Sequence, residues 1–137
     1  MYTLSAETVR QRLEPYREFM KDEILGKQKL IRNLSAGNQQ KVGILAALLH
    51  EPRLVILDEP FNFLDPSSQN LLKQLLKEYN QRTKATVLVS SHNLNQTTEL
   101  CPRIALMEQG RIIRDLDNPD GLAEKELEHY FNEPYHA

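Results

Sequence analysis

The sequence has 137 residues, 26% charged and 40% hydrophobic, with a formal net charge of -2. A chain of this length can form one hydrophobic core without metals, and its single cysteine, Cys101, excludes an internal disulfide and fits a reducing compartment. The near-neutral charge argues against a generic nucleic-acid or membrane-surface binder, and the lack of a long apolar run or a basic, apolar leader predicts a cytosolic domain.

The first predicted elements are two helices. Residues 5–23 are polar and charged, with apolar residues at helical spacing that predict an amphipathic surface helix. These apolar residues are Val9, Leu13, Tyr16 and Met20. A second helix, apolar on most sides, is expected to begin after the N-cap Ser35 and to stop before Pro52.

From residue 54 the sequence alternates between predicted strands and helices. Residues 54–57 form a continuous apolar run, typical of a strand covered on both faces in a parallel sheet, and residues 86–90 repeat this pattern. Between them, Asp65 followed by Pro66 predicts a helix start, because Asp caps helices and Pro fits the first helical position. This order favours an α/β fold with right-handed crossovers.

The remaining sequence predicts a short helix before Pro102, a hairpin and a closing helix. Residues 104–107 form a third strand, and Gln109-Gly110 is a turn that adds an antiparallel edge strand to the sheet. The acidic stretch 117–137 is expected to be helical. Its apolar residues are Leu122, Leu127, Tyr130 and Phe131.

Polar residues follow the predicted parallel strands, where α/β sheets bind their ligands. After the first strand, Asp58 would face a Mg2+ ion through bound water, and Glu59 would orient and deprotonate an attacking water. After the second strand, His92 could donate a hydrogen bond to a phosphate oxygen. The alternative is that these residues are ordinary solvated acids and an exposed histidine.

The start of the second predicted helix is a candidate anion site. Its sequence is Leu34-Ser35-Ala36-Gly37-Asn38-Gln39-Gln40-Lys41. A capping Ser and small residues in the first turn expose backbone N–H groups and the positive end of the helix dipole. Gly37 would leave room for a phosphate near the backbone. The alternative is that Ser35 only caps its own helix.

Taken together and in this order, the motifs resemble the ATP-binding subunit of ABC transporters. The similar stretches are 34–41 to the LSGGQ signature, 54–60 to the Walker B strand with its glutamate, 62–66 to the D-loop, and Ser91-His92 to the switch histidine. The strand and turn that follow, 103–110, are also similar to transporter members. The resemblance covers residues 33–116, and four ordered motifs at compatible spacing make it very specific.

The resemblance implies a role for each matching residue. Asp58 would help to hold Mg2+, Glu59 would be the general base, and His92 would contact the γ-phosphate of ATP. Both ATP and Mg2+ are therefore expected ligands.

The resemblance also implies that two subunits pair. Ser35, Gly37 and Asn38 would lie against ATP that is held by the opposite subunit, and Asp65 would bridge to that subunit. Two residues depart from the family pattern, because Ala36 replaces a glycine and Asn38 replaces a longer glutamine. Both changes weaken the expected contact between signature and nucleotide.

The implied fold is a partial P-loop NTPase-like parallel sheet with flanking helices plus part of a helical subdomain. Residues 1–50 would end the helical subdomain, 51–116 would form the C-terminal part of the α/β ATPase core, and 117–137 would form an acidic C-terminal helix. The implied partners are a second nucleotide-binding domain and membrane-spanning transporter subunits, with no nucleic acid. These subunits would place the chain in the cytoplasm, at the inner face of the cell membrane.

The sequence lacks the family's Walker A loop, GxxxxGK(S/T), and its Q-loop glutamine. Gly26-Lys27 does not fit, because Gln28 follows it and Lys21 stands at the first glycine position. Since charge-assisted hydrogen bonds contribute ~1.5–3 kcal/mol each, losing several lowers ATP affinity by orders of magnitude. We therefore expect the chain alone to be inactive. We also expect an unpaired sheet edge and an uncovered apolar face, which favour association.

Three functions remain open from the sequence. The first is the C-terminal part of a transporter nucleotide-binding domain, which couples ATP binding and hydrolysis to transport across a membrane. The second is a non-catalytic interaction module that docks on a complete ABC ATPase. The third is a soluble ABC-type ATPase of translation or DNA repair. The sequence has no heptad coiled coil and no strongly basic surface, which argues against DNA repair. The first function is favoured.

Overall fold

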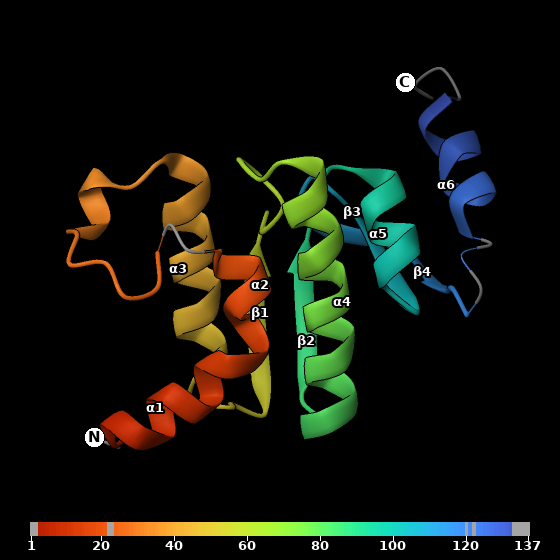
Figure 1. Ribbon diagram of the computed structural model, residues 1–137. Coiled ribbons are helices and arrows are strands. Elements are labelled where there is room, and N and C mark those ends of the chain that lie inside the picture. Colours follow the sequence, from red (N-terminus) through yellow and green to blue (C-terminus); the bar gives the residue numbers. More distant parts are fainter. Residues whose placement is uncertain (1–2, 22–23, 120, 122, 133–137) are drawn as a thin grey trace. The chain divides into compact units, whose positions relative to one another are not determined.

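The computed structural model describes residues 3–21, 24–119, 121 and 123–132, without the side chains of 131 and 132 (Figure 1). The chain divides into two compact units, Met1–Ser90 and Ser91–Ala137. The elements of the first unit are α1 (Ala6–Leu13), η1 (Glu14–Tyr16), α2 (Arg17–Met20), η2 (Ile31–Asn33), α3 (Ala36–Leu48), β1 (Leu54–Asp58), α4 (Pro66–Thr83) and β2 (Thr86–Ser90). The elements of the second unit are α5 (Leu94–Leu100), β3 (Arg103–Glu108), β4 (Arg111–Asp117) and α6 (Ala123–Asn132).

The single helix predicted over residues 5–23 is wrong, because the structure has three short pieces there. Pro15 has no N–H to donate to the carbonyl four residues earlier, so the chain tightens into the 3-10 turn η1 between α1 and α2. Residues 22 and 23 lie outside the described residues. The predicted apolar face is confirmed, since Tyr16 and Met20 are buried and Val9 and Leu13 are half-buried.

The two predicted helix starts at Ser35 and Asp65 are confirmed. The Ser35 hydroxyl accepts a hydrogen bond from the Asn38 N–H at 3.3 Å, and α3 begins at the next residue. The Asp65 carboxylate accepts the Ser68 N–H at 2.6 Å, with Pro66 in the first turn of α4. Each cap satisfies an N–H group that the helix itself leaves unpaired.

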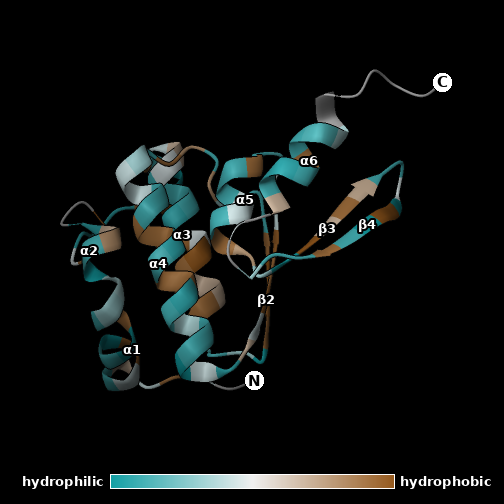
Figure 2. Cartoon of the chain, turned by 90° about the vertical axis from the view of Figure 1, so that its right-hand side faces the viewer, coloured by the Kyte–Doolittle hydropathy of each residue, from teal (hydrophilic) through white to brown (hydrophobic). Residues whose placement is uncertain are grey.

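β1 and β2 form a parallel pair whose two faces differ. Their register joins Leu54 to Thr86 and Asp58 to Ser90, and Figure 2 shows hydrophobic residues along β2. Val55 and Leu57 are buried on the face that α3 and α4 contact. The opposite face is apolar and exposed. Its large side chains are Leu54 at 54%, Ile56 at 65% and Leu88 at 58% exposure.

The prediction that these strands are covered on both faces is therefore wrong for the described residues, and the prediction of an uncovered apolar face is confirmed. The physical reason lies in the alternating burial of β1: α3 contacts β1 and α4 contacts β2, and the side chains on the opposite face stay exposed. Parallel sheets normally occur with both faces covered by helices, so this pair corresponds to part of a larger sheet.

The second unit is built on a β3–β4 hairpin. Gln109 and Gly110 have φ values of 47° and 76°, as a two-residue type I′ turn requires, so the predicted turn is confirmed. β3 pairs antiparallel with β4 over Arg103–Glu108 and Arg111–Asp117. The tight turn explains this pairing, because it brings β4 back beside β3. The hairpin belongs to the second unit and the parallel pair to the first, so the addition of this hairpin to the parallel sheet stays a prediction.

Asn118 connects the elements of the second unit. Its buried side-chain amide donates to the carbonyls of Thr98 at 2.7 Å and Cys101 at 2.8 Å, and its carbonyl accepts the Ala123 N–H at 3.1 Å. Ile104, Ala123 and Leu127 form the small core beside it. The closing helix is confirmed as α6, whereas Leu122, residues 133–137 and the Phe131 side chain lie outside the described residues.

Among the described residues, no helix has both the length and the apolar character needed to cross a membrane.

Candidate functional site

The predicted carboxylates Asp58 and Glu59 end β1 opposite the last residue of β2. The Ser90 hydroxyl accepts the Glu59 N–H at 3.0 Å and donates to the Asp58 carboxylate. The Glu59 N–H is also 3.2 Å from the Ser90 carbonyl oxygen. Ser90 therefore fixes both acidic residues to the neighbouring strand. Ser90 is not among the residues predicted for the site, although it ends a predicted strand.

The loop from residue 59 to residue 63 has left-handed backbone at both ends. Glu59 has a φ of 47° and Phe63 has a φ of 64°. Such a conformation is uncommon for residues with a side chain and costs ~1–3 kcal/mol. The loop is held by side chains from two helices, since Gln40 donates to the Glu59 carbonyl and Gln69 donates to the Phe61 carbonyl. Strain that is held by surrounding contacts is typical of functional sites.

The predicted anion site at the start of α3 is arranged around Gly37. A Cβ atom at this position would lie 2.6 Å from the Phe63 carbonyl oxygen, a distance that real Cβ atoms do not adopt. The glycine is therefore required where α3 meets the loop that follows β1. Ser35 is exposed and uses its hydroxyl as the helix cap, accepting the Asn38 N–H. Their contact with a phosphate stays a prediction.

Asp65 serves as the cap of α4. One carboxylate oxygen accepts the Ser68 N–H at 2.6 Å, the other accepts the Ser68 hydroxyl at 3.1 Å, and the Lys21 ammonium lies 3.9 Å away. The hydrogen bond from the Ser68 backbone, helped by the Ser68 hydroxyl and Lys21, lowers the pKa of the Asp65 carboxyl. A bridge from Asp65 to a partner subunit stays a prediction.

The residues present fit a weakly held Mg2+ ion. Within the described part of the chain, no group of three or more His, Cys, Asp or Glu side chains could hold a metal by itself. Mg2+ usually keeps several waters and binds through one or two carboxylates plus substrate phosphates. The exposed Asp58 carboxylate, oriented by Ser90, matches this mode.

The predicted switch residue His92 lies at the start of the second unit. Its side chain is exposed, and the next residue, Asn93, caps α5 by accepting the Gln96 N–H at 3.1 Å. Ser91 accepts the Asn93 N–H at 3.0 Å. Asp58 and Glu59 belong to the first unit, so the approach of His92 to them stays a prediction.

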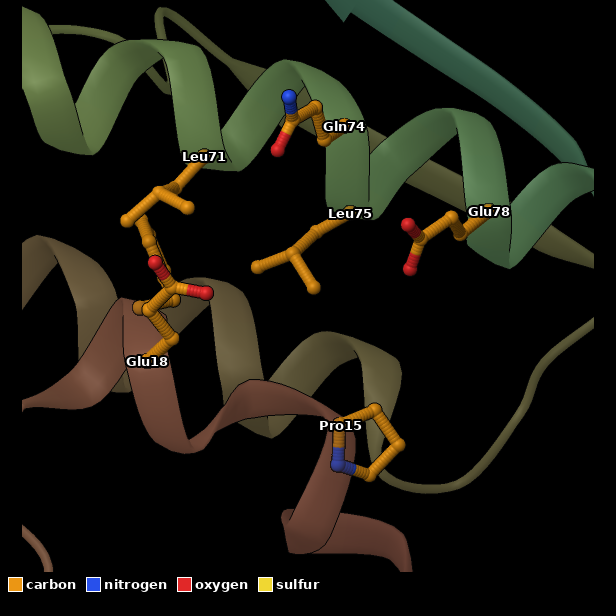
Figure 3. Close-up of a pocket in the computed structure, with 7 residues that line it drawn as sticks. Pro15, Glu18, Leu71, Gln74, Leu75 and Glu78 are labelled. Atoms are coloured by element: carbon orange, nitrogen blue, oxygen red, sulfur yellow. The ribbon is translucent and has the colours of Figure 1, made fainter.

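A shallow groove lies between the η1–α2 segment and α4 (Figure 3). Its lining residues are Pro15, Glu18, Phe19, Leu71, Gln74, Leu75 and Glu78. None of the predicted site residues is among them. The candidate site is therefore the end of β1 with the adjoining start of α3, and not this groove.

This chain is similar to a known protein family and to ATP-binding proteins of transporters. The family described as "AAA domain, putative AbiEii toxin, Type IV TA system" matches residues 13–96. The methionine import ATP-binding protein MetN of Carboxydothermus hydrogenoformans is 37% identical over 84 residues, which are 61% of this chain and 25% of that protein. The choline transport ATP-binding protein OpuBA of Bacillus subtilis is 31% identical over 126 residues, covering 90% of this chain and 33% of that protein.

Solved structures agree with these sequence relatives. The dimeric structure of MJ0796, a bacterial ABC transporter cassette, superposes with a TM-score of 0.72 and 30% identity over 85% of this chain and 50% of that chain. An ATP-binding subunit of an ABC transporter gives a TM-score of 0.75 and 30% identity, over 97% of this chain and 53% of that chain. The chain thus spans about half of these structures and at most a third of the two curated relatives. It belongs to the AAA domain family, and over most of its length it is similar to part of ABC transporter ATP-binding subunits.

Proposed function

We propose that this chain is the C-terminal part of an ABC transporter nucleotide-binding domain, which couples ATP binding and hydrolysis to transport across a membrane. The observation that carries the proposal is the pair Asp58 and Glu59, fixed by Ser90 at the end of a parallel strand. Ligands of α/β sheets bind at this end of the strands. Of two adjacent acids at this position, one can bind a metal ion and the other can activate a water molecule.

Each of these side chains has a separate task in hydrolysis. Glu59 accepts a proton from a water whose oxygen bonds to the terminal phosphorus of ATP, while the bond from that phosphorus to the bridging oxygen breaks and ADP leaves. Asp58 would hold Mg2+, and His92 would donate a hydrogen bond to the γ-phosphate. When bound, Mg2+ neutralises charge that develops on the phosphate oxygens.

A second nucleotide-binding domain completes the proposed site. Ser35, Gly37 and Asn38 contact the γ-phosphate side of ATP on the opposite subunit, where the N-terminus of α3 favours an anion. Asp65 bridges to that subunit. Support comes from the relative whose structure is described as a dimeric cassette. Membrane-spanning subunits hold the pair at the inner face of the cell membrane, as the transport names of the relatives suggest.

The chain alone is proposed to be inactive, because its sequence has no Walker A loop to hold the β- and γ-phosphates. The exposed apolar face of β1 and β2 supports this proposal, since a complete cassette would cover it. Titration of the isolated chain with Mg-ATP in a calorimeter is expected to give no micromolar binding. Micromolar binding would contradict the proposal.

A chimera tests the catalytic assignment directly. This chain replaces the matching stretch of the choline transport ATP-binding protein, so that the relative supplies the remaining two thirds of an ATP-binding chain. The chimera is expected to hydrolyse ATP, and Glu59→Gln is expected to lower kcat at least about 100-fold with little change in KM. The matched control is Glu78→Gln, an exposed acid on α4. Equal hydrolysis by the Glu59→Gln and control variants would overturn the role of Glu59.

A further inference from the structure

Gln40 connects α3 to the loop that carries Glu59. It lies on the second turn of α3, is half-buried, and donates its side-chain amide to the Glu59 carbonyl at 3.3 Å. The family resemblance assigned it no role. It is the amide side chain from α3 that reaches the candidate base, whereas its neighbour Gln39 bonds to Leu34 at the start of its own helix.

A second contact on the same side of α3 reaches the other end of the loop. Gly37 is three residues before Gln40, and residues at this spacing share a helix face. The Phe63 carbonyl packs where a Cβ of Gly37 would lie. One face of α3 therefore contacts both loop residues that have a left-handed backbone conformation, Glu59 and Phe63.

The Glu59 carbonyl has two donors of different kinds. The Asn62 N–H, at 3.1 Å, belongs to the same loop and can move with it. The Gln40 amide comes from a helix outside the loop, so it fixes the loop in place. Residues with unfavourable backbone conformations persist only where surrounding contacts hold them. Removing the Gln40 donor removes one of these contacts at Glu59 itself.

We propose that Gln40 is a positioning residue, whose amide holds the left-handed backbone that aims the Glu59 side chain and fastens the signature helix to that base. This inference rests on the proposed function, because it gives the orientation of Glu59 a catalytic purpose. Since Ser35 caps α3, the bond also makes the position of Glu59 depend on the position of the signature. A nucleotide that moves α3 would thereby move the base.

The test is hydrogen exchange of the full chain, read by mass spectrometry on peptides. Gln40→Met keeps the length of the side chain and removes the donor. It is expected to speed exchange in a peptide over residues 57–65 by roughly fivefold, the effect of losing one hydrogen bond. Gln40→Lys restores an N–H donor of similar reach, and its exchange is expected to stay within about twofold of the parent chain. Gln74→Met on the exposed side of α4 is the matched control.

Every result decides the proposal. Faster exchange in the loop with Met, rescue with Lys and an unchanged control support it. Equal exchange for Met and Lys would show that the donor is irrelevant and overturn it. Faster exchange throughout α4 as well would assign Gln40 to overall folding and also overturn it.

A kinetic measurement separates positioning from structure. In the chimera with the choline transport relative, Gln40→Met is expected to lower kcat about tenfold with an unchanged KM for ATP, because misplacing a base by small distances slows chemistry. An unchanged kcat would overturn the catalytic purpose of the bond. Exchange needs no nucleotide, so its failure would leave the ATPase proposal standing, and failure of the chimera to hydrolyse ATP would leave the exchange result interpretable.

Discussion

Glu51, at the junction between α3 and β1, is the residue on which two arginines converge. It pairs with Arg82 of α4 and lies 3.6 Å from the Arg12 guanidinium of α1. Arg12 also donates to the Leu49 carbonyl at 2.6 Å. Three segments that are far apart in the sequence are thus joined at one carboxylate, so its charge state is linked to the stability of the first unit.

Acid is expected to weaken this junction. The hydrogen bond from Arg82, with the charges of Arg82 and Arg12, lowers the pKa of Glu51 in the folded chain. A lowered folded pKa gives stability that is present above the ordinary glutamate pKa and is lost as the pH falls through the lowered value. Urea unfolding at neutral pH and at about pH 3 is expected to show this loss. Glu51→Gln should reduce the difference between the two conditions, and an unchanged difference would contradict the prediction.

The sequence predicts the hydrogen-bonding role of some residues and not of others. Ser35 and Asp65 were predictable, because a cap depends on residue type and on the next few positions. Ser90, Gln40 and Asn118 were not, because their partners lie 31, 19 and 20 residues away along the chain. Only the folded chain brings a neutral hydroxyl or amide to a particular carbonyl or N–H group.

Helices, strands and turns are also predictable where neighbouring residues determine them, and not where distant residues do. The Asp65-Pro66 start of α4 and the Gln109-Gly110 turn are local, and both are present as predicted. The break at Pro15 is also local, because proline interrupts helices. The regular spacing of the apolar residues favoured one continuous helix, and this prediction was wrong. The place of the β3–β4 hairpin relative to β1 and β2 is not readable, since apolar runs give no information about which neighbour the outer edge of a strand takes.

The stability of helix α3 is expected to depend on its N-cap, Ser35. Ser35→Ala removes the side chain that accepts the Asn38 N–H and is expected to lower the free energy of unfolding by about 1 kcal/mol. Ser35→Asp keeps a strong cap and should retain the stability of the parent chain. Urea unfolding followed by circular dichroism measures both.

The same pair of variants separates capping from phosphate contact. In the chimera, Ser35→Asp places a negative charge where the γ-phosphate of the partner's ATP is proposed to lie, so ATP-driven pairing should be lost although the helix is intact. Pairing is measured by size-exclusion chromatography with ATP in the Glu59→Gln background. If the stable Ser35→Asp variant still paired, Ser35 would be a cap alone.

In the molecule as a whole, the uncovered apolar face of β1 and β2 is the feature that differs most from an independently folded domain, which buries such a face. The sequence indicated it only through a missing motif, because a continuous apolar run by itself predicted coverage on both faces. The structure supplies the reason, since Val55 and Leu57 are buried while Ile56 and Leu88 on the opposite face are exposed. An apolar stripe next to unpaired strand edges favours contact with another polypeptide.

We therefore expect the isolated chain to associate through this face. Ile56 and Leu88 are paired in register and are 65% and 58% exposed. Burying such a side chain contributes ~1.5–3 kcal/mol, so replacing both by Lys should raise the dissociation constant at least about 100-fold. The matched control is Met107→Lys, which changes a side chain that is 66% exposed in the second unit. Light scattering over a range of concentrations measures the mass of each variant. A parent chain that is monomeric throughout, or a Met107→Lys variant that dissociates as fully as the double variant, would show that the β1–β2 face does not drive association.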